Sequence, residues 1–524
     1  MPEYLSPGVY IEEVDSGPRP IEGVGTATAA FVGLTPAGPP RQPQLITNWS
    51  QFVETFGAID ENGRRNPHMS GAYLSHAVYG FFLNGGGRCY VTRIVPDGAT
   101  ETSSQPQAQP LALPSRSSQA ITSLTATPKE PLSEDIQIEI APPAGENPPE
   151  ENFTLKVKRG DIEEVYENVS LSRRSGTTNV IEAVREKSQL ITLEEGSASG
   201  PLAERAPSIG TYILRAQPME LTTTTTSFSP ADFVGDVTER SGVEGLEIAE
   251  DVTMVCCPDI MAAYQAGALD LEGVKAIQLA MINHCERMGD RMAILDTPPG
   301  LTPQQAREWR QVTTNFDSKF AALYYPWIKV AGDNGAPITI PPSGHMAGIW
   351  ARNDNERGVH KAPANEVVRG ALEVETPITK GEQDVLNPIG VNCIRSFTGR
   401  GIRVWGARTL SSDPAWRYIN VRRLFNYVEK SIENGTQWVV FEPNDPDLWH
   451  RVRRDITAFL TGVWRDGMLF GLSPDQAFFV KCDEELNPPD VRDRGQLIVD
   501  IGLAPVKPAE FVIFRLSQWT GGGA

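Results

Sequence analysis

The chain has 524 residues, of which 40% are hydrophobic, and it carries a formal net charge of −19 at pH 7. This length allows several domains, and the apolar content supports a substantial core, so a largely disordered chain is excluded. The acidic balance disfavours nucleic-acid binding by the chain as a whole, because phosphates attract basic surfaces.

The first 25 residues have the character of an arm that lacks a partner within its own chain. Residues 4–13 alternate like a strand, and the run that follows is too rich in Pro and Gly to continue any element. Such a segment cannot bury enough surface to order itself. The glycines between residues 16 and 25 are expected to let the arm swing. The side chains expected to take part in strand exchange between copies are those of Leu5, Val9, Tyr10 and Ile11.

Strands and helices alternate in the two stretches that we assign to a middle domain, residues 26–96 and 242–360. Thr302 and Pro303 have the residue types of a helix N-cap and first turn, and they predict one of the helices. The alternation is typical of α/β folds. The other helices are predicted at 50–56, 70–83 and 271–288, and the strands at 26–34, 88–95, 252–257, 291–296 and 320–325.

Residues 97–241 differ from their surroundings because they are rich in Ser, Thr, Gln and Pro. Short alternating segments at 136–140 and 153–157 predict strands, and residues 179–187 predict a short helix. We therefore interpret the block as a separate, mostly β domain that is inserted into the main fold and faces outward.

The C-terminal core domain is expected over residues 361–510, with helices at 413–433 and 447–467. The second helix has an apolar stripe, and arginines with acidic neighbours lie on its opposite side. That charged face is either an ordinary solvated surface or a contact for an acidic partner, and both interpretations stay open. The stripe contains Trp449, Val452, Ile456, Phe459, Leu460 and Val463, and the arginines are Arg451, Arg454 and Arg465.

Two strands are predicted at the end of the chain, at 496–503 and 510–516, and together they suggest a hairpin with a free edge. Residues 511–524 are expected to form an exchange strand and a tail. A free edge pairs readily with a strand from another copy, which is β-augmentation. The residues expected in this exchange are Leu497, Val499, Ile501, Phe511, Ile513, Phe514 and Leu516.

The Cys, His and Asp residues of this sequence show none of the spacings that are typical of a catalytic or metal site. The six cysteines form no CxxC pair and mostly lie in apolar runs, which favours reduced, buried thiols, including Cys256 and Cys257. The six histidines have no ligand spacing, so we expect no metal site. Asp259 and Asp296 follow predicted strands without a His, Lys or Gly-loop partner, and we interpret them as a turn and a helix cap.

The sequence also lacks the motifs that are typical of a small-molecule site and the segments that are typical of exported or membrane proteins. The Gly-rich run at 84–88 follows a helix and precedes a strand, the reverse of a phosphate loop, so it is interpreted as a helix C-cap. The sequence has no GxSxG elbow, and we expect neither an enzyme nor a cofactor. Signal-peptide blocks are missing, and no apolar run approaches the ~18 residues of a membrane helix. We therefore expect cytoplasmic assembly without membrane insertion.

Several blocks of the sequence resemble contractile phage tail sheath proteins. The likeness covers residues 1–95 and 250–524, and many blocks agree in order, whereas residues 97–241 match no block. The blocks include SPGVYIEE at 6–13, NGGGRCYV at 84–91, PSGHMAGIW at 342–350, GRGIRVWGARTL at 399–410, YINVRR at 418–423 and APVKPAEF at 504–511.

The resemblance implies a multidomain α+β or α/β sheath fold, in which the arms of neighbouring copies complete a hairpin in the C-terminal domain. It also implies a structural function: six-fold rings stack around an inner tube, and their contraction drives the tube through a target envelope. The implied partners are other copies of the chain, the inner tube protein, and baseplate and terminal cap proteins. A helix near the C-terminal end would face the tube, and helical spacing independently nominates Arg451, Arg454 and Arg465 for that contact.

Two other functions stay open from the residues alone. One is an α/β hydrolase-like enzyme built on residues 250–330, which would need a convergent acid–base set. The other is a surface-binding module centred on 97–241, which would be monomeric rather than polymeric. Within the sheath interpretation, the sequence does not separate a phage tail from a released phage-tail-like injection particle.

Overall fold

The computed structural model forms two compact units, which are residues 1–56, 67–96 and 225–524, and residues 57–66 and 97–224. Leu5, Val9, Tyr10 and Ile11, which were expected in strand exchange, lie outside the residues that the structure describes. The described residues are 20–59, 63–95, 111–117, 121–129, 135–143, 148–160, 162–172, 178–196, 198, 200–214, 228–332 and 335–516.

The first unit is built on an eight-stranded sheet with the order β2-β5-β1-β14-β15-β16-β20-β21. The six inner strands are parallel, and β2 and β21 pair antiparallel at the two edges. The strands are β1 Thr28–Gly33, β2 Gln44–Ile46, β5 Arg88–Arg93, β14 Met254–Cys256, β15 Met292–Asp296, β16 Ala321–Tyr325, β20 Val391–Phe397 and β21 Gly401–Val404.

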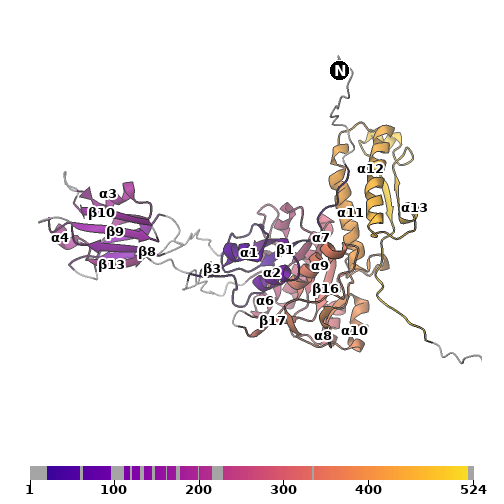
Figure 1. Ribbon diagram of the computed structural model, residues 1–524, viewed down its shortest axis with the longest axis horizontal. Helices are drawn as coiled ribbons and strands as arrows, with labels where there is room; N and C mark the ends of the chain where they lie inside the picture. Colours follow the sequence, from indigo (N-terminus) through magenta and orange to yellow (C-terminus); the bar gives the residue numbers. More distant parts are fainter. Residues whose placement is uncertain are drawn as a thin grey trace, which may run out of the picture. The chain divides into compact units, whose positions relative to one another are not determined.

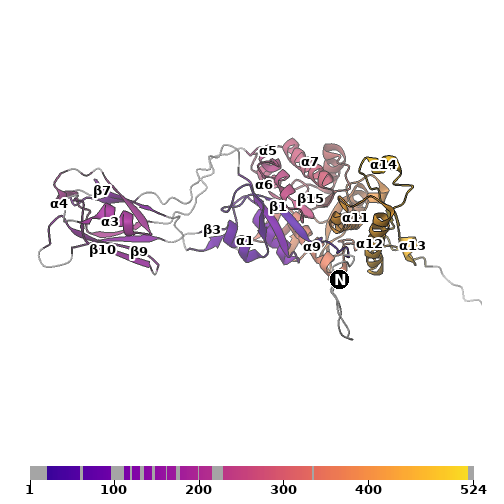
Figure 2. The ribbon, with the colours of Figure 1, turned by 90° about the horizontal axis from the view of Figure 1, so that it is seen from above.

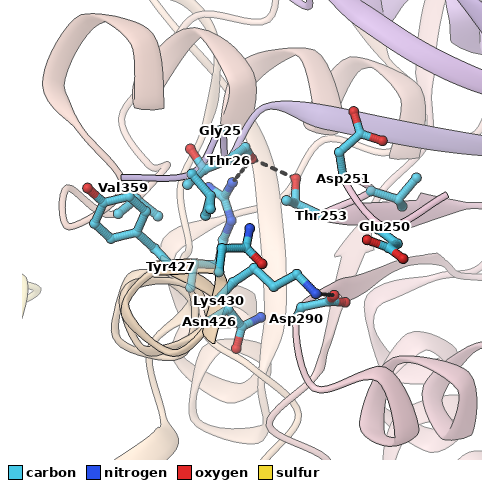
Figure 3. Close-up of a pocket in the computed structure, with 14 residues that line it drawn as sticks. Gly25, Thr26, Glu250, Asp251, Thr253, Asp290, Val359, Asn426, Tyr427 and Lys430 are labelled. Atoms are coloured by element: carbon cyan, nitrogen blue, oxygen red, sulfur yellow. Dashed lines mark hydrogen bonds and ion pairs between the residues drawn. The ribbon is translucent and has the colours of Figure 1, made fainter. Parts of the chain in front are cut away.

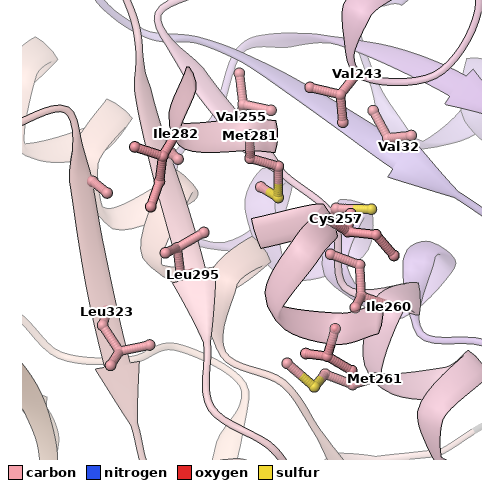
Figure 4. Close-up of a cluster of buried hydrophobic side chains, with 14 of the residues drawn as sticks. Val32, Val243, Val255, Cys257, Ile260, Met261, Met281, Ile282, Leu295 and Leu323 are labelled. Carbon is pink, nitrogen blue, oxygen red and sulfur yellow. The ribbon is translucent and has the colours of Figure 1, made fainter. Parts of the chain in front are cut away.

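Helices cover both faces of this sheet, because the buried parallel strands are apolar on both sides. Figure 2 shows α5, α6 and α7 on one side of β1 and β15, and α1 and α9 on the other. On the first side, Val255 and Leu295 of the strands pack against Met281 and Ile282 of α7 (Figure 4). The helices are α1 Trp49–Phe56, α2 Leu74–Leu83, α5 Pro230–Val234, α6 Asp259–Gln265, α7 Leu271–Met288, α8 Pro303–Glu308 and α9 Ser343–Arg357.

Helices α2 and α9 cross at unusually short range on the second face. A Cβ atom built on Gly344 would lie 2.6 Å from the carbonyl carbon of Ala77. One built on Gly348 would lie 2.8 Å from the Cβ of Asn84. The missing side chains therefore allow the two backbones to touch.

The C-terminal part of the first unit has an apolar cluster of its own. Helices α11 Ile419–Gly435 and α12 Pro446–Arg465 share it with the two-stranded sheet of β22 Phe478–Lys481 and β23 Asp500–Leu503 (Figure 1). The predicted stripe of α12 is confirmed, because all six of its residues belong to this cluster or pack against it. The remaining elements of the first unit are β17 Ile328–Ala331, β18 Pro337–Ile340, β19 Ala371–Val374, α10 Lys380–Leu386, α13 Pro474–Ala477 and α14 Pro489–Asp493.

The second unit contains a five-stranded sheet, β11-β10-β9-β8-β13, and a three-stranded sheet, β12-β7-β6. They enclose an apolar core to which β8 contributes every second residue, Ile136, Ile138 and Ile140. The strands are β6 Leu111–Pro114, β7 Thr122–Pro128, β8 Ile136–Ala141, β9 Phe153–Arg159, β10 Ile162–Ser170, β11 Thr178–Asn179, β12 Ile191–Glu195 and β13 Gly210–Leu214; the helices are α3 Val180–Lys187 and α4 Leu202–Arg205. A short antiparallel pair, β3 Ala58–Ile59 and β4 Arg65–Asn66, also belongs to this unit.

The predicted hairpin at the end of the chain is wrong in its pairing. The strand partner of β23 is β22, which lies before it in the sequence, and not residues 510–516. Residues 511–516 form no helix or strand in the described part of the chain. The apolar composition of 510–516 predicts one arm of a hairpin, but after Leu503 the chain continues beside Leu469, which forms an isolated bridge with Pro505.

Candidate assembly interface at the two chain ends

The last described residues leave the first unit as an extended segment with apolar side chains (Figures 1 and 2). Phe511 is 71% exposed, Ile513 79%, Phe514 83% and Leu516 97%. Soluble proteins seldom expose so many large apolar side chains in one short run, and such runs mark interaction sites. The segment also has the β-branched and aromatic composition of a strand. It therefore has the composition of a strand, but it pairs with no segment in the described part of its own chain.

The Glu510 carboxylate anchors the point from which residues 511–516 leave the body, and we call this point the root of the segment. The Glu510 side chain accepts hydrogen bonds from Arg408 Nε and Nη2, at 2.9 and 2.7 Å. It also accepts from the Tyr418 hydroxyl at 2.9 Å and from Asn387 Nδ2 at 2.7 Å. Partial burial raises the pKa of Glu510, but these hydrogen bonds and the charge of Arg408 outweigh burial and hold the pKa below its ordinary value. The carboxylate is therefore charged and fully engaged at the point where the chain leaves the body.

The N-terminal segment, residues 21–26, is anchored on helix α11, and we call these contacts its root. The Val24 backbone N–H donates to Ser431 Oγ at 3.1 Å, and Ile21 is buried in the apolar cluster of α11 and α12. Further along, Arg423 Nη2 donates to the Thr26 carbonyl oxygen at 2.8 Å, and both of its terminal nitrogens donate to the Asp354 carboxylate. These contacts fix the chain from Ile21 to Thr26, immediately before β1.

Gly23 does not serve as a free hinge in this root. A Cβ atom at this position would lie 2.9 Å from Cζ of the Tyr427 ring, so the glycine allows close packing on α11. Gly23 is thus packed in this structure, and the expectation that the glycines let the arm swing stays a prediction. Gly17 lies outside the described residues.

A cavity of about 310 Å³ lies beside this root, between α11 and the chain that enters β14 (Figure 3). Lys430 reaches from α11 to Asp290, with Nζ and Oδ2 3.4 Å apart. Thr253 Oγ1 donates to the Thr26 carbonyl oxygen at 2.6 Å. Thr253 thus holds the crossing segment, and Lys430 joins α11 to the turn before β15.

The sheet of β22 and β23 offers an edge on which another strand could add. Within the described residues it has two strands, so the outer edge of each is without a strand partner. Phe479 is 54% exposed and lies on the outer face above Gly502, whereas Phe478 and Val480 face the apolar cluster. The nominated residues Leu497, Val499 and Ile501 are half-buried and pack on the same cluster, so their side chains support the edge from inside.

The nominated arginines of α12 are exposed, and two of them have acidic partners. Arg451 lies 3.1 Å from Glu442, and its guanidinium lies over the Trp438 ring. Arg454 lies 3.0 Å from Asp455. The face is therefore mixed in charge, as its sequence indicated, and ion pairs of this exposed kind are weak.

The acids at the carboxyl ends of the sheet strands hold neighbouring backbone. The Asp259 carboxylate accepts N–H bonds from Leu34, Tyr73 and Leu74, and Asp296 accepts one from Ser343 at the start of α9. Burial raises the pKa of Asp259 to about 6 and that of Asp296 to about 7, although the hydrogen bonds oppose the shift. The helix-cap interpretation thus holds for both acids, which cap the distant helices α2 and α9, whereas a turn role is shown for neither.

The thiols and the Gly-rich run also agree with the sequence. All six cysteines are buried, and burial raises the pKa of the Cys256 and Cys257 thiols, which opposes thiolate chemistry. Helix α2 ends at Leu83 with Asn84 as its C-cap. Among the described residues no group of three His, Cys, Asp or Glu side chains could hold a metal ion. No helix in the same part of the chain is long and apolar enough to span a membrane.

The side chains that anchor the two chain ends were not predicted from the sequence. Arg408 and Glu510 lie within two of the resembling blocks, but 102 positions separate them along the chain. No local spacing rule connects residues that far apart. The extended, apolar character of 511–516 was the available signal, and it indicated the strand but not its anchor.

Family models match the second half of this chain. The phage tail sheath protein central domain matches residues 245–410, and the phage tail sheath C-terminal domain matches residues 411–518. The tail sheath protein of Burkholderia phage BcepMu is 23% identical over 533 residues, covering 97% of this chain and 95% of that protein. A local match to the tail sheath protein of Vibrio phage KVP40 is 30% identical over 177 residues, covering 33% of this chain and 26% of that protein.

Two solved structures of similar fold are contracted sheaths. The helical sheath of the anti-feeding prophage in its contracted state has a TM-score of 0.58 and 24% identity, and the match covers 98% of this chain and 99% of that chain. The contracted sheath complex of an extracellular contractile injection system, named PVC, has a TM-score of 0.54 and 24% identity, covering 99% of each chain. At this identity the likeness shows the fold.

Proposed function

The chain belongs to the contractile phage tail sheath family, and we propose from this premise that it is the structural protomer of a contractile sheath. Copies polymerise as stacked hexameric rings around an inner tube, and contraction of the sheath drives the tube through a target envelope. The observation that supports this proposal best is the pair of chain ends. Each end is anchored where it leaves the body, and the C-terminal one continues as an exposed apolar strand.

In this proposal the exposed strand of one copy and the N-terminal arm of another add to the β22–β23 edge of a third copy. A backbone hydrogen bond contributes about 0.5–1.5 kcal/mol net, so an added strand with about five such bonds contributes several kcal/mol. Each copy both lends and receives strands. The links between copies are thus strong enough to persist while rings rotate and approach one another.

The competing functions have less support. An enzyme on residues 250–330 would use Asp259 or Asp296, but the backbone N–H groups of other segments already occupy these buried carboxylates. A surface-binding module is compatible with the second unit, but it would leave the exposed strand at 511–516 without a use. A module of that kind on the outside of a sheath remains part of the sheath proposal.

The test of the proposed function is the assembly state of the purified full chain. We expect tubes or stacked rings with six-fold symmetry in negative-stain images, and elution at high mass from a sizing column. A stable monomer across a wide concentration range would contradict the proposal, because an exposed exchange strand then has no role.

We further propose that Arg451, Arg454 and Arg465 contact the acidic surface of the inner tube. Exposed ion pairs contribute roughly 0–1 kcal/mol each, so this grip is weak and releasable compared with an added strand. Reversing all three arginines to Glu is expected to weaken co-sedimentation with the purified tube protein by about tenfold or more. Self-assembly of the chain should stay unchanged.

The matched control reverses three exposed basic residues of the second unit, Lys158, Arg185 and Lys187. This control changes the net charge by the same amount. Equal loss of tube binding in both triple variants would mean that overall charge, and not the α12 face, governs the contact.

A further inference from the structure

The Glu510 carboxylate joins three separate segments at the root of the exposed strand. Arg408 lies in the loop after β21, Tyr418 immediately precedes α11, and Asn387 follows α10. We call these four residues the root latch. The next backbone anchors upstream are the Val506 N–H, which donates to the Met468 carbonyl at 3.3 Å, and the Ala504 N–H. Glu510 is thus the last side-chain anchor before the exposed residues, within the described part of the chain.

The latch continues into the main sheet through Asn392 of β20. The Arg408 backbone N–H donates to Asn392 Oδ1 at 2.7 Å, and Asn392 Nδ2 donates to the Arg408 carbonyl oxygen at 2.8 Å. Asn392 Nδ2 also donates to the Leu323 carbonyl oxygen of β16 at 3.2 Å. An unbroken set of hydrogen bonds therefore connects the root of the C-terminal strand to two neighbouring parallel strands.

We infer that Glu510 is a positioning residue that transmits the pull of a neighbouring copy from the C-terminal strand into the central sheet. This inference rests on the proposed function, since only an exchanged strand carries load. When the latch is closed, a pull on residues 511–516 meets Arg408 and the sheet behind it. When it is open, the same pull falls on the hydrogen bonds of the Ala504 and Val506 backbone, and the strand root can peel away.

The chemistry of the latch requires a carboxylate opposite a guanidinium. Two oxygens accept the parallel N–H groups of Arg408 and still accept from Tyr418 and Asn387. A Gln at this position keeps the shape but has one acceptor oxygen, and its NH₂ group would face the donors of Arg408. A Lys in place of Arg408 keeps the charge but loses the two-pronged geometry.

The test compares tubes of the full chain with tubes of the Glu510→Gln and Arg408→Lys variants in increasing urea. Light scattering reports dissociation of tubes, and near-UV circular dichroism reports unfolding of the subunit. For Glu510→Gln we expect a lower urea midpoint for tube dissociation, corresponding to an association constant weakened by about tenfold or more, because a charge-assisted pair is lost. The subunit unfolding midpoint should stay unchanged, and the double variant should be no weaker than Glu510→Gln alone.

Glu373→Gln is the matched control, because Glu373 forms an exposed ion pair with Lys329, with Nζ and Oε2 2.7 Å apart, away from the latch. Tubes of Glu510→Gln that dissociate at the wild-type midpoint would overturn the inference. A parallel fall of both midpoints would also overturn it, since that is the signature of a role in folding alone. If the wild-type chain forms no tubes, the proposed function fails instead.

Discussion

A chain that stops at Glu510 is expected to fold normally and to form no tubes. The removed residues, 511–524, include the exposed strand, whose described side chains contribute little to any core because Val512, the least exposed of its large apolar residues, is still 69% exposed. Their loss removes an added strand from every link between copies, or several kcal/mol at about 1 kcal/mol per hydrogen bond. Each 1.4 kcal/mol is about a tenfold change in association, so assembly should disappear at ordinary concentrations.

The matched control for this truncation is a chain that stops at Leu516, which keeps the strand and removes only the tail. Negative-stain images and a sizing column measure assembly, and near-UV circular dichroism measures packing of the core. Tubes formed by the chain that stops at Glu510 would show that the C-terminal strand does not link the copies. Failure of both truncated chains would assign the link to residues 517–524 instead.

Replacing Gly344 with Val is expected to have the largest effect on the stability of the subunit. The new Cβ would lie 2.6 Å from the carbonyl carbon of Ala77, and backbone cannot rotate away as a side chain can. Helices α2 and α9 must then separate, which opens the packing along their crossing at Gly344 and Gly348. Overpacked sites typically cost 1–3 kcal/mol, and we expect about 3 kcal/mol or more because the neighbour is backbone. This is a large part of the ~5–15 kcal/mol that stabilises a typical domain.

Urea unfolding followed by far-UV circular dichroism measures this loss, with Gly381→Val as the control. Gly381 is also in a helix, α10, but a Cβ atom there meets nothing within 4 Å. The control should stay close to the wild-type midpoint. Equal loss in the two variants would mean that helix propensity, and not the crossing of α2 and α9, sets the cost.

Long, regular patterns made the central fold predictable. Helix α7 has the predicted bounds, because its apolar spacing runs between an N-cap Asp270 and a C-cap Gly289. The apolar runs at β1, β15 and β16 identified strands that are buried on both faces. Helix α9 gave no such pattern, because it is buried on most sides and mixes Gly344, His345 and Asn353 with apolar residues.

Pairing over long separations was not predictable. The strand predicted at 496–503 is confirmed only at its end, since β23 spans Asp500–Leu503. Its partner was not predicted, because short edge strands carry no mark of which segment they pair with. The same limit applies to Glu510 and Arg408, whose contact depends on the tertiary fold. The sheath resemblance supplied the general function, and the structure supplied the anchoring groups that make a mechanical proposal testable.

Helix α11 contributes to the anchoring of both chain ends. Contacts with the N-terminal segment run along it from Arg423 to Gly435, while Tyr418 at its beginning holds the latch. The helix has 17 residues and is therefore about 25 Å long. The points at which the two chain ends are anchored thus lie toward opposite ends of one helix. Under the proposed function, this one helix therefore sets the distance between the points at which the two lent chain ends leave a subunit.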